Sequence, residues 1–127
     1  MPRFVILTHD HPFVHWDLLI EAGKTAQTWR LFESPARWLS DPSIVIAAES
    51  IAAHRLMYLD YEGPVSRERG RVARWDHGVA EWIRRDASLV RVRLLGEILT
   101  GELTIDRDAS RPLWSIRFLT AAPNTND

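Results

Sequence analysis

The sequence contains no cysteine. This absence excludes a disulfide-stabilised scaffold, a thiolate metal site and a cysteine nucleophile. Long hydrophobic runs are also lacking, since no stretch approaches the roughly 18–20 apolar residues that span a bilayer. The apolar run that follows Met1 is too short for a signal peptide. We therefore expect a cytoplasmic protein that does not contact a membrane.

Lysine is almost absent as well. Lys24 is the single lysine among 16 basic residues, and the other 15 are arginine. One explanation is a coding bias toward arginine. The other is selection for the planar guanidinium fork, which binds phosphate or carboxylate through two parallel hydrogen bonds. The formal net charge of -1 gives the chain no overall attraction to nucleic acid.

The arginines are concentrated between positions 63 and 95, a segment that contains eight arginines and four acidic residues. Strand alternation in this segment would place two groups of arginines on common faces. One group is Arg67, Arg69 and Arg71, and the other is Arg91 and Arg93. Such a pattern is typical of a solvated outer face. The functional alternative is a groove that follows a phosphate backbone.

The rest of the composition is that of a globular domain with 127 residues, 46% of them hydrophobic and 26% charged. Short β-favouring runs alternate with turn signals about every 8–12 residues. We predict a mainly β fold, a small closed or nearly closed antiparallel β-barrel of about eight strands with one or two short helices. The predicted strands are residues 4–7, 15–21, 26–32, 44–48, 79–84, 89–95, 98–106 and 113–120.

The helical predictions fall in two segments, one turn around Trp38 and one or two turns within residues 52–61. The run 44–48 is ambiguous because Asp41 and Pro42 are able to begin a helix there, but its β-branched start favours a strand. The residues from Trp75 to Gly78 resemble a turn. No repeat divides the chain, so we expect one domain over residues 1–120 and a frayed tail over 121–127.

Three histidines, His9, His11 and His15, cluster before Asp17. His15 and Asp17 are two residues apart on a predicted strand, so both side chains leave one face, with Cα atoms about 7 Å apart. His9 precedes the turn and returns to that face from the adjacent strand. Two imidazoles and one carboxylate leave coordination positions open, as catalytic manganese, zinc or iron sites do. The alternative is a histidine-rich turn whose imidazoles cap backbone groups.

Trp16, Leu18 and Ile20 leave the opposite face of the same strand and are predicted to be core. His54 and Tyr58 form a second pair, because residues four apart share a face of a helix. Together they are able to donate to a phosphate oxygen and move a proton. From their spacing alone, a capping histidine and a half-buried core tyrosine explain this pair better.

The order of these motifs resembles the 3′-phosphoesterase domain of bacterial DNA ligase D. His9-Asp10, four residues and then His15-Trp16-Asp17 resemble the family's H-D-x4-H-Y-D motif. The resemblance covers about residues 3–119. It continues through Thr28-Trp29, the stretch from His54 to Gly63, the segment from Trp75 to Gly78, the glycine-marked strands with Gly96 and Gly101, and the strand from Leu113 to Ile116.

The resemblance implies a small β-barrel with a crescent groove and a divalent metal, commonly manganese, with zinc as the alternative. Family members trim the 3′ ends of DNA during end joining, removing a terminal ribonucleotide and then the 3′-phosphate. Carried over by position, the metal ligands would be His9, His15 and Asp17. His54 would contact the scissile phosphate, and Tyr58 would complete the active site.

Several positions depart from the family pattern. Leu19 stands where the family has a phosphate-gripping arginine, and Glu33 where it has a lysine. Ile46 replaces a basic residue and Ala52 an acidic one. Each lost charge-assisted contact is worth on the order of 1.5–3 kcal/mol. Candidates to replace them as phosphate ligands are Arg30, Arg55 and Arg69.

Two main hypotheses follow. The first is a stand-alone, metal-dependent phosphoesterase that acts on nucleic-acid 3′ ends in DNA repair, with separate end-joining or repair proteins as partners. The second is a non-catalytic, metal-binding relative that binds nucleic acid or a protein partner, and Leu19 and Glu33 favour it. An enzyme with a non-nucleic substrate is the remaining alternative.

Overall fold

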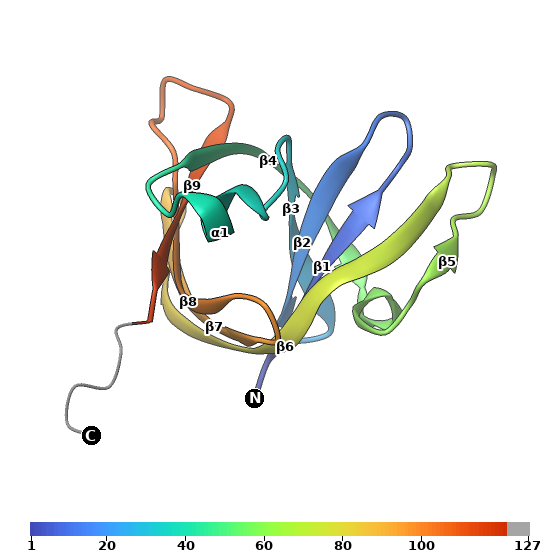
Figure 1. The fold of residues 1–127 in the computed structure, drawn as a ribbon, viewed down its shortest axis with the longest axis horizontal. Helices are drawn as coiled ribbons and strands as arrows, with labels where there is room; N and C mark the ends of the chain where they lie inside the picture. The colour runs from blue at the N-terminus through green and yellow to red at the C-terminus, as the bar shows by residue number, and fades with distance from the viewer. Residues whose placement is uncertain (122–127) are drawn as a thin grey trace.

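The computed structural model describes residues 1–121 (Figure 1). Strands dominate this part of the chain, with one short α-helix and one 3₁₀ helix. In chain order the elements are β1 (Arg3–His9), β2 (His15–Ala22), β3 (Thr25–Leu31), α1 (Arg37–Ser40), β4 (Val45–Arg55), η1 (Leu56–Leu59), β5 (Gly63–Pro64), β6 (Arg71–Arg85), β7 (Leu89–Gly96), β8 (Thr100–Asp106) and β9 (Trp114–Thr120).

Eight of the strands form a ring. They neighbour one another in the order β1-β2-β3-β4-β9-β8-β7-β6, and β6 pairs back with β1. All of these pairings are antiparallel. The short β5 is paired with β6 beyond the ring. The predicted mainly β, barrel-like fold with two short helices is therefore confirmed.

The main core lies on one face of the ring strands, as period-two alternation requires. On β2 this face carries Leu18 and Ile20, which are fully buried, and Trp16, which packs against the same cluster. The helix α1 adds Trp38, whose indole N–H donates to the carbonyl oxygen of Ile44 at 2.9 Å. The predicted core assignment for these β2 residues is confirmed.

A second, smaller core cluster lies on the other face of β1, β2 and β3. Val5, Leu7 and Leu19 belong to it and alternate along the strands with main-core residues. Ala26 of β3, Leu59 of η1 and Val72 of β6 are its other buried members. Figure 1 shows η1 and β5 outside the ring, on the side of β1 and β6. This covered outer face is where the site is built.

One predicted element is shorter than expected and another is wrong. The helical turn predicted within residues 52–61 is limited to η1, and residues 52–55 are strand, because His54 and Arg55 still pair with β3 and ladder hydrogen bonds override a local helical preference. The segment from Trp75 to Gly78 is not a turn, because β6 runs through it while pairing with β1. A β-bulge at Trp75, opposite the step from Ile6 to Leu7, absorbs the irregularity.

The two arginine groups have different surroundings. On β7, Arg91 contacts Glu102 and Arg93 contacts Glu81 at 3.3 Å, which is the solvated outer face predicted as the simpler explanation. The other group does not share a strand face, since residues 66–68 form a turn and β6 begins only at Arg71. The positive charge between positions 63 and 95 therefore does not form one phosphate-tracking stripe.

Ala121 is the last described residue, and its amide donates to the carbonyl oxygen of Thr100 at 3.1 Å. The tail predicted over 121–127 lies, from residue 122 onward, outside the described residues. In the part of the chain that the structure describes, no helix combines the length and apolar character needed to cross a membrane.

Candidate metal centre and cleft

His9, His15 and Asp17 converge on the outer face of β1 and β2. His9 lies opposite His15 in the ladder between these strands, and Asp17 is two residues further along β2. The His9 Nδ1 atom is 3.6 Å from Asp17 Oδ2, and the His15 Nε2 atom is 3.4 Å from Asp17 Oδ1. One potential ligand atom from each residue lies within 4.8 Å of the others. We call these three residues the triad.

Backbone carbonyls hold the outer nitrogen of each imidazole. His9 Nε2 is 2.8 Å from the carbonyl oxygen of Arg69, and His15 Nδ1 is 2.9 Å from that of Phe13. Because a carbonyl oxygen only accepts, these nitrogens carry the hydrogen and donate it. The inner nitrogens of both rings therefore present lone pairs to the Asp17 carboxylate, which also offers only lone pairs when ionised.

This arrangement of acceptors fits a divalent cation. His15 is fully buried and Asp17 is 3% exposed. Within residues 1–121, neither His15 Nε2 nor Asp17 Oδ1 has a hydrogen-bond partner, which is costly for buried polar atoms. A cation bound by the two imidazoles and the carboxylate would give each of these three side chains a partner for its lone pairs. The carbonyl partners on the outer nitrogens are typical of metal-binding histidines.

Asp10 attaches the histidine-bearing loop to the start of β6. Its carboxylate accepts a hydrogen bond from the Arg71 amide at 2.8 Å, and its own amide donates to the Arg71 carbonyl at 3.4 Å. Gly70 lies so close that an added Cβ would be 2.2 Å from the Asp10 carboxylate, and its φ is +76°. The His9-Asp10 motif thus combines a predicted ligand with the anchor of its loop.

The turn that supplies the Arg69 carbonyl is strained. Arg67 and Glu68 have φ values of 64° and 57°, a left-handed conformation that costs non-glycine residues roughly 1–2 kcal/mol each. Such conformations persist where the surrounding structure determines them, and they concentrate at functional sites. Here the turn places a carbonyl oxygen on His9.

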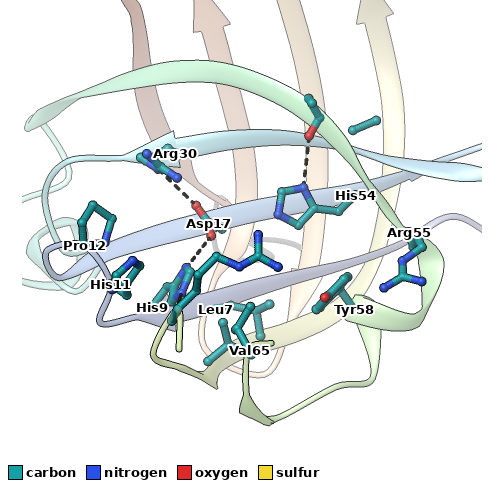
Figure 2. Close-up of a pocket in the computed structure, with 14 residues that line it drawn as sticks. Leu7, His9, His11, Pro12, Asp17, Arg30, His54, Arg55, Tyr58 and Val65 are labelled. Atoms are coloured by element: carbon teal, nitrogen blue, oxygen red, sulfur yellow. Dashed lines mark hydrogen bonds and ion pairs between the residues drawn. The ribbon is translucent and has the colours of Figure 1, made fainter. Parts of the chain in front are cut away.

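A cleft of about 460 Å³ opens beside the triad and is lined by His9 and Asp17. Its wall includes the apolar side chains of Leu7, Val65 and Val72. Figure 2 shows His11 and Pro12 at one end of the cleft and Arg55 at the other. His11 therefore lines one end of the cleft and is not part of the triad. The cleft has the mixed apolar and polar lining of a small-ligand or chain-end site.

His54 and Tyr58 both line this cleft, although the predicted helical geometry is wrong. His54 lies near the end of β4 and Tyr58 is in η1, with ring centroids 5.7 Å apart and planes at 72°. His54 Nδ1 is 3.1 Å from the Ala52 carbonyl oxygen and therefore donates to it. The remaining nitrogen, Nε2, is the basic one, able to accept a proton or, once protonated, to donate it.

The three arginines predicted as phosphate ligands all line the cleft. Arg30 lies opposite Asp17 in the β2–β3 ladder, and its Nε atom is 3.9 Å from Asp17 Oδ1. Arg55 lies over the Tyr58 ring at 5.9 Å. Arg69 donates from Nε to the Ser66 carbonyl oxygen at 2.8 Å. Of the three side chains, that of Arg30 makes the ion pair with the triad.

The structure places the departing positions in different environments. Leu19 is fully buried in the smaller cluster, beside cleft-lining Leu7 and Val72. Ile46 is fully buried in the main core, on the opposite sheet face from the triad. Glu33 is paired with Arg37. Where the resemblance leads us to expect positive charge, the structure therefore has apolar packing at two positions and an ion pair at the third.

Sequence reasoning missed the carbonyl groups of Arg69 and Phe13, because backbone atoms leave no residue-type signal. It also missed Leu7, Val65 and Val72 as cleft residues. Leu7 ends the unbroken apolar run from Phe4, Val72 lies outside the predicted strands, and the segment around Val65 has no periodic pattern. The sequence therefore carries no signal that assigns these three side chains to the outer face.

Comparison with known proteins gives two similarities. The family model described as the DNA Ligase D 3′-phosphoesterase domain matches residues 7–107. A curated relative, the "Multifunctional non-homologous end joining protein LigD" of Pseudomonas aeruginosa, is 29% identical over 130 residues. That similarity covers 94% of this chain and 15% of the relative, so the chain spans a small part of that relative's length.

Proposed function

The chain belongs to the DNA ligase D 3′-phosphoesterase domain family, and from this we propose that it is a divalent-metal-dependent phosphoesterase acting on nucleic-acid 3′ ends. The reaction would be removal of a 3′-phosphate or a 3′-terminal ribonucleotide. Family membership supports a role related to DNA-repair phosphoesterases. The observation that carries the proposal is the triad, whose buried lone pairs converge at the edge of a cleft lined by arginines.

The residues have separate roles in this proposal. The triad would hold a divalent ion, with manganese as the first choice and zinc as the second. When bound, such an ion supplies positive charge that stabilises a phosphoryl oxygen. Arg30, which lies across the β2–β3 ladder from Asp17, would bind a second phosphate oxygen. His54, through Nε2, would transfer a proton to or from the reacting group, and Tyr58 would orient His54 by ring contact.

The substrate and partners follow from the same comparison. The relative's name describes a multifunctional end-joining protein, and the chain corresponds to a small part of it. We propose that 3′ ends trimmed by this domain pass to separate end-joining or repair activities. Arg55 and Arg69, which also line the cleft, would contact other phosphates of the bound strand.

The second candidate function is that of a non-catalytic, metal-binding relative that binds nucleic acid or a protein partner. The observation in its favour is the apolar replacement of basic positions by Leu19 and Ile46, both fully buried. Under this alternative the triad binds metal and the cleft binds a strand, but no phosphoester bond is broken. Metal binding alone therefore does not distinguish the two candidates.

The decisive experiment is a trimming assay. Purified protein with Mn²⁺ is incubated with a primer–template that carries a 3′-phosphate or a single 3′-ribonucleotide, and the primer products are resolved by electrophoresis. We expect wild type to trim the primer, Asp17→Ala to be inactive, and Asp106→Ala, a carboxylate change on β8, to act like wild type. Wild type that binds Mn²⁺ but trims neither primer would support the non-catalytic alternative.

A further inference from the structure

Two exposed aromatic side chains lie beside the cleft. Phe13 is 50% exposed and Phe32 is 37% exposed. Their ring centroids are 6.5 Å apart and their planes differ by 23°, so the rings are stacked with an offset. Neither belongs to a core cluster found within the described residues. A flat apolar surface of this kind gains free energy when a ligand covers it.

The aromatic pair is close to the triad. Phe13 follows Pro12, which lines one end of the cleft (Figure 2). The Phe13 and His15 rings meet edge to face with their centroids 5.6 Å apart, and the His15 ring centroid lies 4.8 Å from that of His9. The sugar and base next to a phosphate at the triad are therefore within reach of Phe13.

The charges near the pair suit a polyanion with flat bases. Arg30 follows Trp29 on β3, two residues before Phe32, and lines the same end of the cleft as Pro12. The acidic neighbour, Glu33, is paired with Arg37. A cationic cleft beside exposed aromatic rings is how proteins bind single-stranded ends, because each base has a face that stacks.

We propose that Phe13 and Phe32 form a stacking platform for one base near the 3′ end of the strand bound in the cleft. This inference rests on the proposed function, since that function brings a nucleic-acid end to the triad. A base at a strand end exposes its flat face, whereas a base inside a duplex is covered by its neighbours. The platform would set where the end stops along the cleft, and it would do so without reading base identity.

The test measures binding rather than turnover. Primer–templates that end in a 3′-hydroxyl are titrated with protein and Mn²⁺ and followed by fluorescence anisotropy. One base is removed in turn from each of the last three primer nucleotides, leaving the backbone intact. The proteins are wild type, Phe13→Ala, Phe32→Ala, Phe13→Leu, which stays apolar but has no flat ring, and Leu119→Ala, a control at an exposed residue of β9. Mn²⁺ binding is measured for each, to show that the triad is intact.

For wild type and Leu119→Ala, we expect base removal at one of the three positions to weaken binding about 5- to 100-fold. For the Phe13 variants, the intact primer should already bind that much more weakly, and removal of the same base should change affinity less than about 2-fold. Phe32→Ala should show the same loss in reduced form. The inference is overturned if base removal has no effect on wild type, or has the same effect on wild type and both Phe13 variants.

This outcome is separable from the proposed function. Phosphate release from a 3′-phosphate primer, measured on the same wild-type sample, tests the phosphoesterase proposal alone. Phosphate release without base-dependent binding would contradict the stacking platform and support the phosphoesterase proposal. Base-dependent binding without phosphate release would support the stacking platform and indicate a non-catalytic domain that binds nucleic-acid ends.

Discussion

At the scale of single residues, the tautomers of His9 and His15 decide what the triad binds. Each ring gives its one N–H to a backbone carbonyl, so neither is able to donate to Asp17 without gaining a second proton. Three buried or partly buried acceptors that face one another repel. A cation between them converts that repulsion into coordination, and this is why the triad supports a metal centre more strongly than a hydrogen-bonded network.

Arg30 carries the next residue-scale expectation. Substitution by Ala removes the guanidinium beside Asp17 and should weaken binding of a 3′-phosphate oligonucleotide by about 10- to 100-fold, the value of a charge-assisted hydrogen bond. Arg30→Lys should recover part of the loss, since a point charge replaces a fork. Affinity is measured by anisotropy with Mn²⁺ present.

The matched control for Arg30 is Arg93→Ala, which removes an arginine of the outer face paired with Glu81. It should bind the oligonucleotide like wild type. Equal affinities for Arg30→Ala and Arg93→Ala would show that Arg30 does not hold the phosphate, and would transfer that role to Arg55 or Arg69.

At the same scale, the sequence predicts the grouping of His9, His15 and Asp17, because strand alternation and one turn bring them to one face. It does not predict the environment of Leu19. From the family resemblance alone, Leu19→Arg would be expected to restore a phosphate contact, whereas the structure buries Leu19 completely. A charge buried there without a partner is destabilising, and Arg30 already supplies a cation from the neighbouring strand.

At the scale of elements, period-two patterns predict β2 and its two faces well. Sequence patterns are less reliable where a helical spacing and a strand ladder fall on the same segment. His54 and Tyr58 have helical spacing, yet the β3–β4 ladder continues through His54 and the helix begins only at Leu56. The two side chains still meet, because the chain turns from β4 into η1. Their proximity was predicted from helical spacing, but in the structure it results from the turn between β4 and η1.

Strand β6 links the two halves of the ring, and Gly78 shows how tightly it is packed. An added Cβ at Gly78 would lie 2.0 Å from the carbonyl oxygen of Leu95 and 2.9 Å from the Cα of Gly96. We expect Gly78→Ala to lower the free energy of unfolding by about 3 kcal/mol or more, because both neighbours are backbone. Urea denaturation followed by tryptophan fluorescence measures this change.

Gly23→Ala is the control for that substitution. Gly23 has a φ of +65° but nothing within 4 Å of the added Cβ, so only backbone strain of about 1–2 kcal/mol applies. Similar losses for the two variants would mean that β6 and β7 separate easily at this point, and that the closed ring is less rigid than the close approach indicates.

At the scale of the whole molecule, the ring has two unlike sides. Its main core supports the sheet, while the outer face of β1 to β3 carries a smaller cluster, the triad and the cleft. The sequence predicts a barrel from eight short strands. It does not predict that η1 and β5 fold back over one outer face, because these segments lack periodicity and their position depends on contacts with β1 and β6.

The position of the site on the outer face of the ring explains why its residues come from distant parts of the chain. The triad lies on β1 and β2, Arg30 on β3, His54 on β4, and the Arg69 carbonyl just before β6. Pairing of β6 with β1 closes the ring and brings the Arg69 carbonyl oxygen to His9. The site is therefore complete only in the folded ring, and a ligand that binds it should stabilise the whole domain.

The proposed metal centre requires His9, His15 and Asp17 to bind one divalent ion. Electron paramagnetic resonance of Mn²⁺ titrated into the metal-free protein measures this binding. We expect one saturable site per chain in wild type and in the Asp106→Ala control, loss of that site in Asp17→Ala, and stabilisation of wild type by about 2.7 kcal/mol when free Mn²⁺ is 100 times Kd. An Asp17→Ala variant that is folded and still binds one Mn²⁺ with wild-type affinity would contradict it.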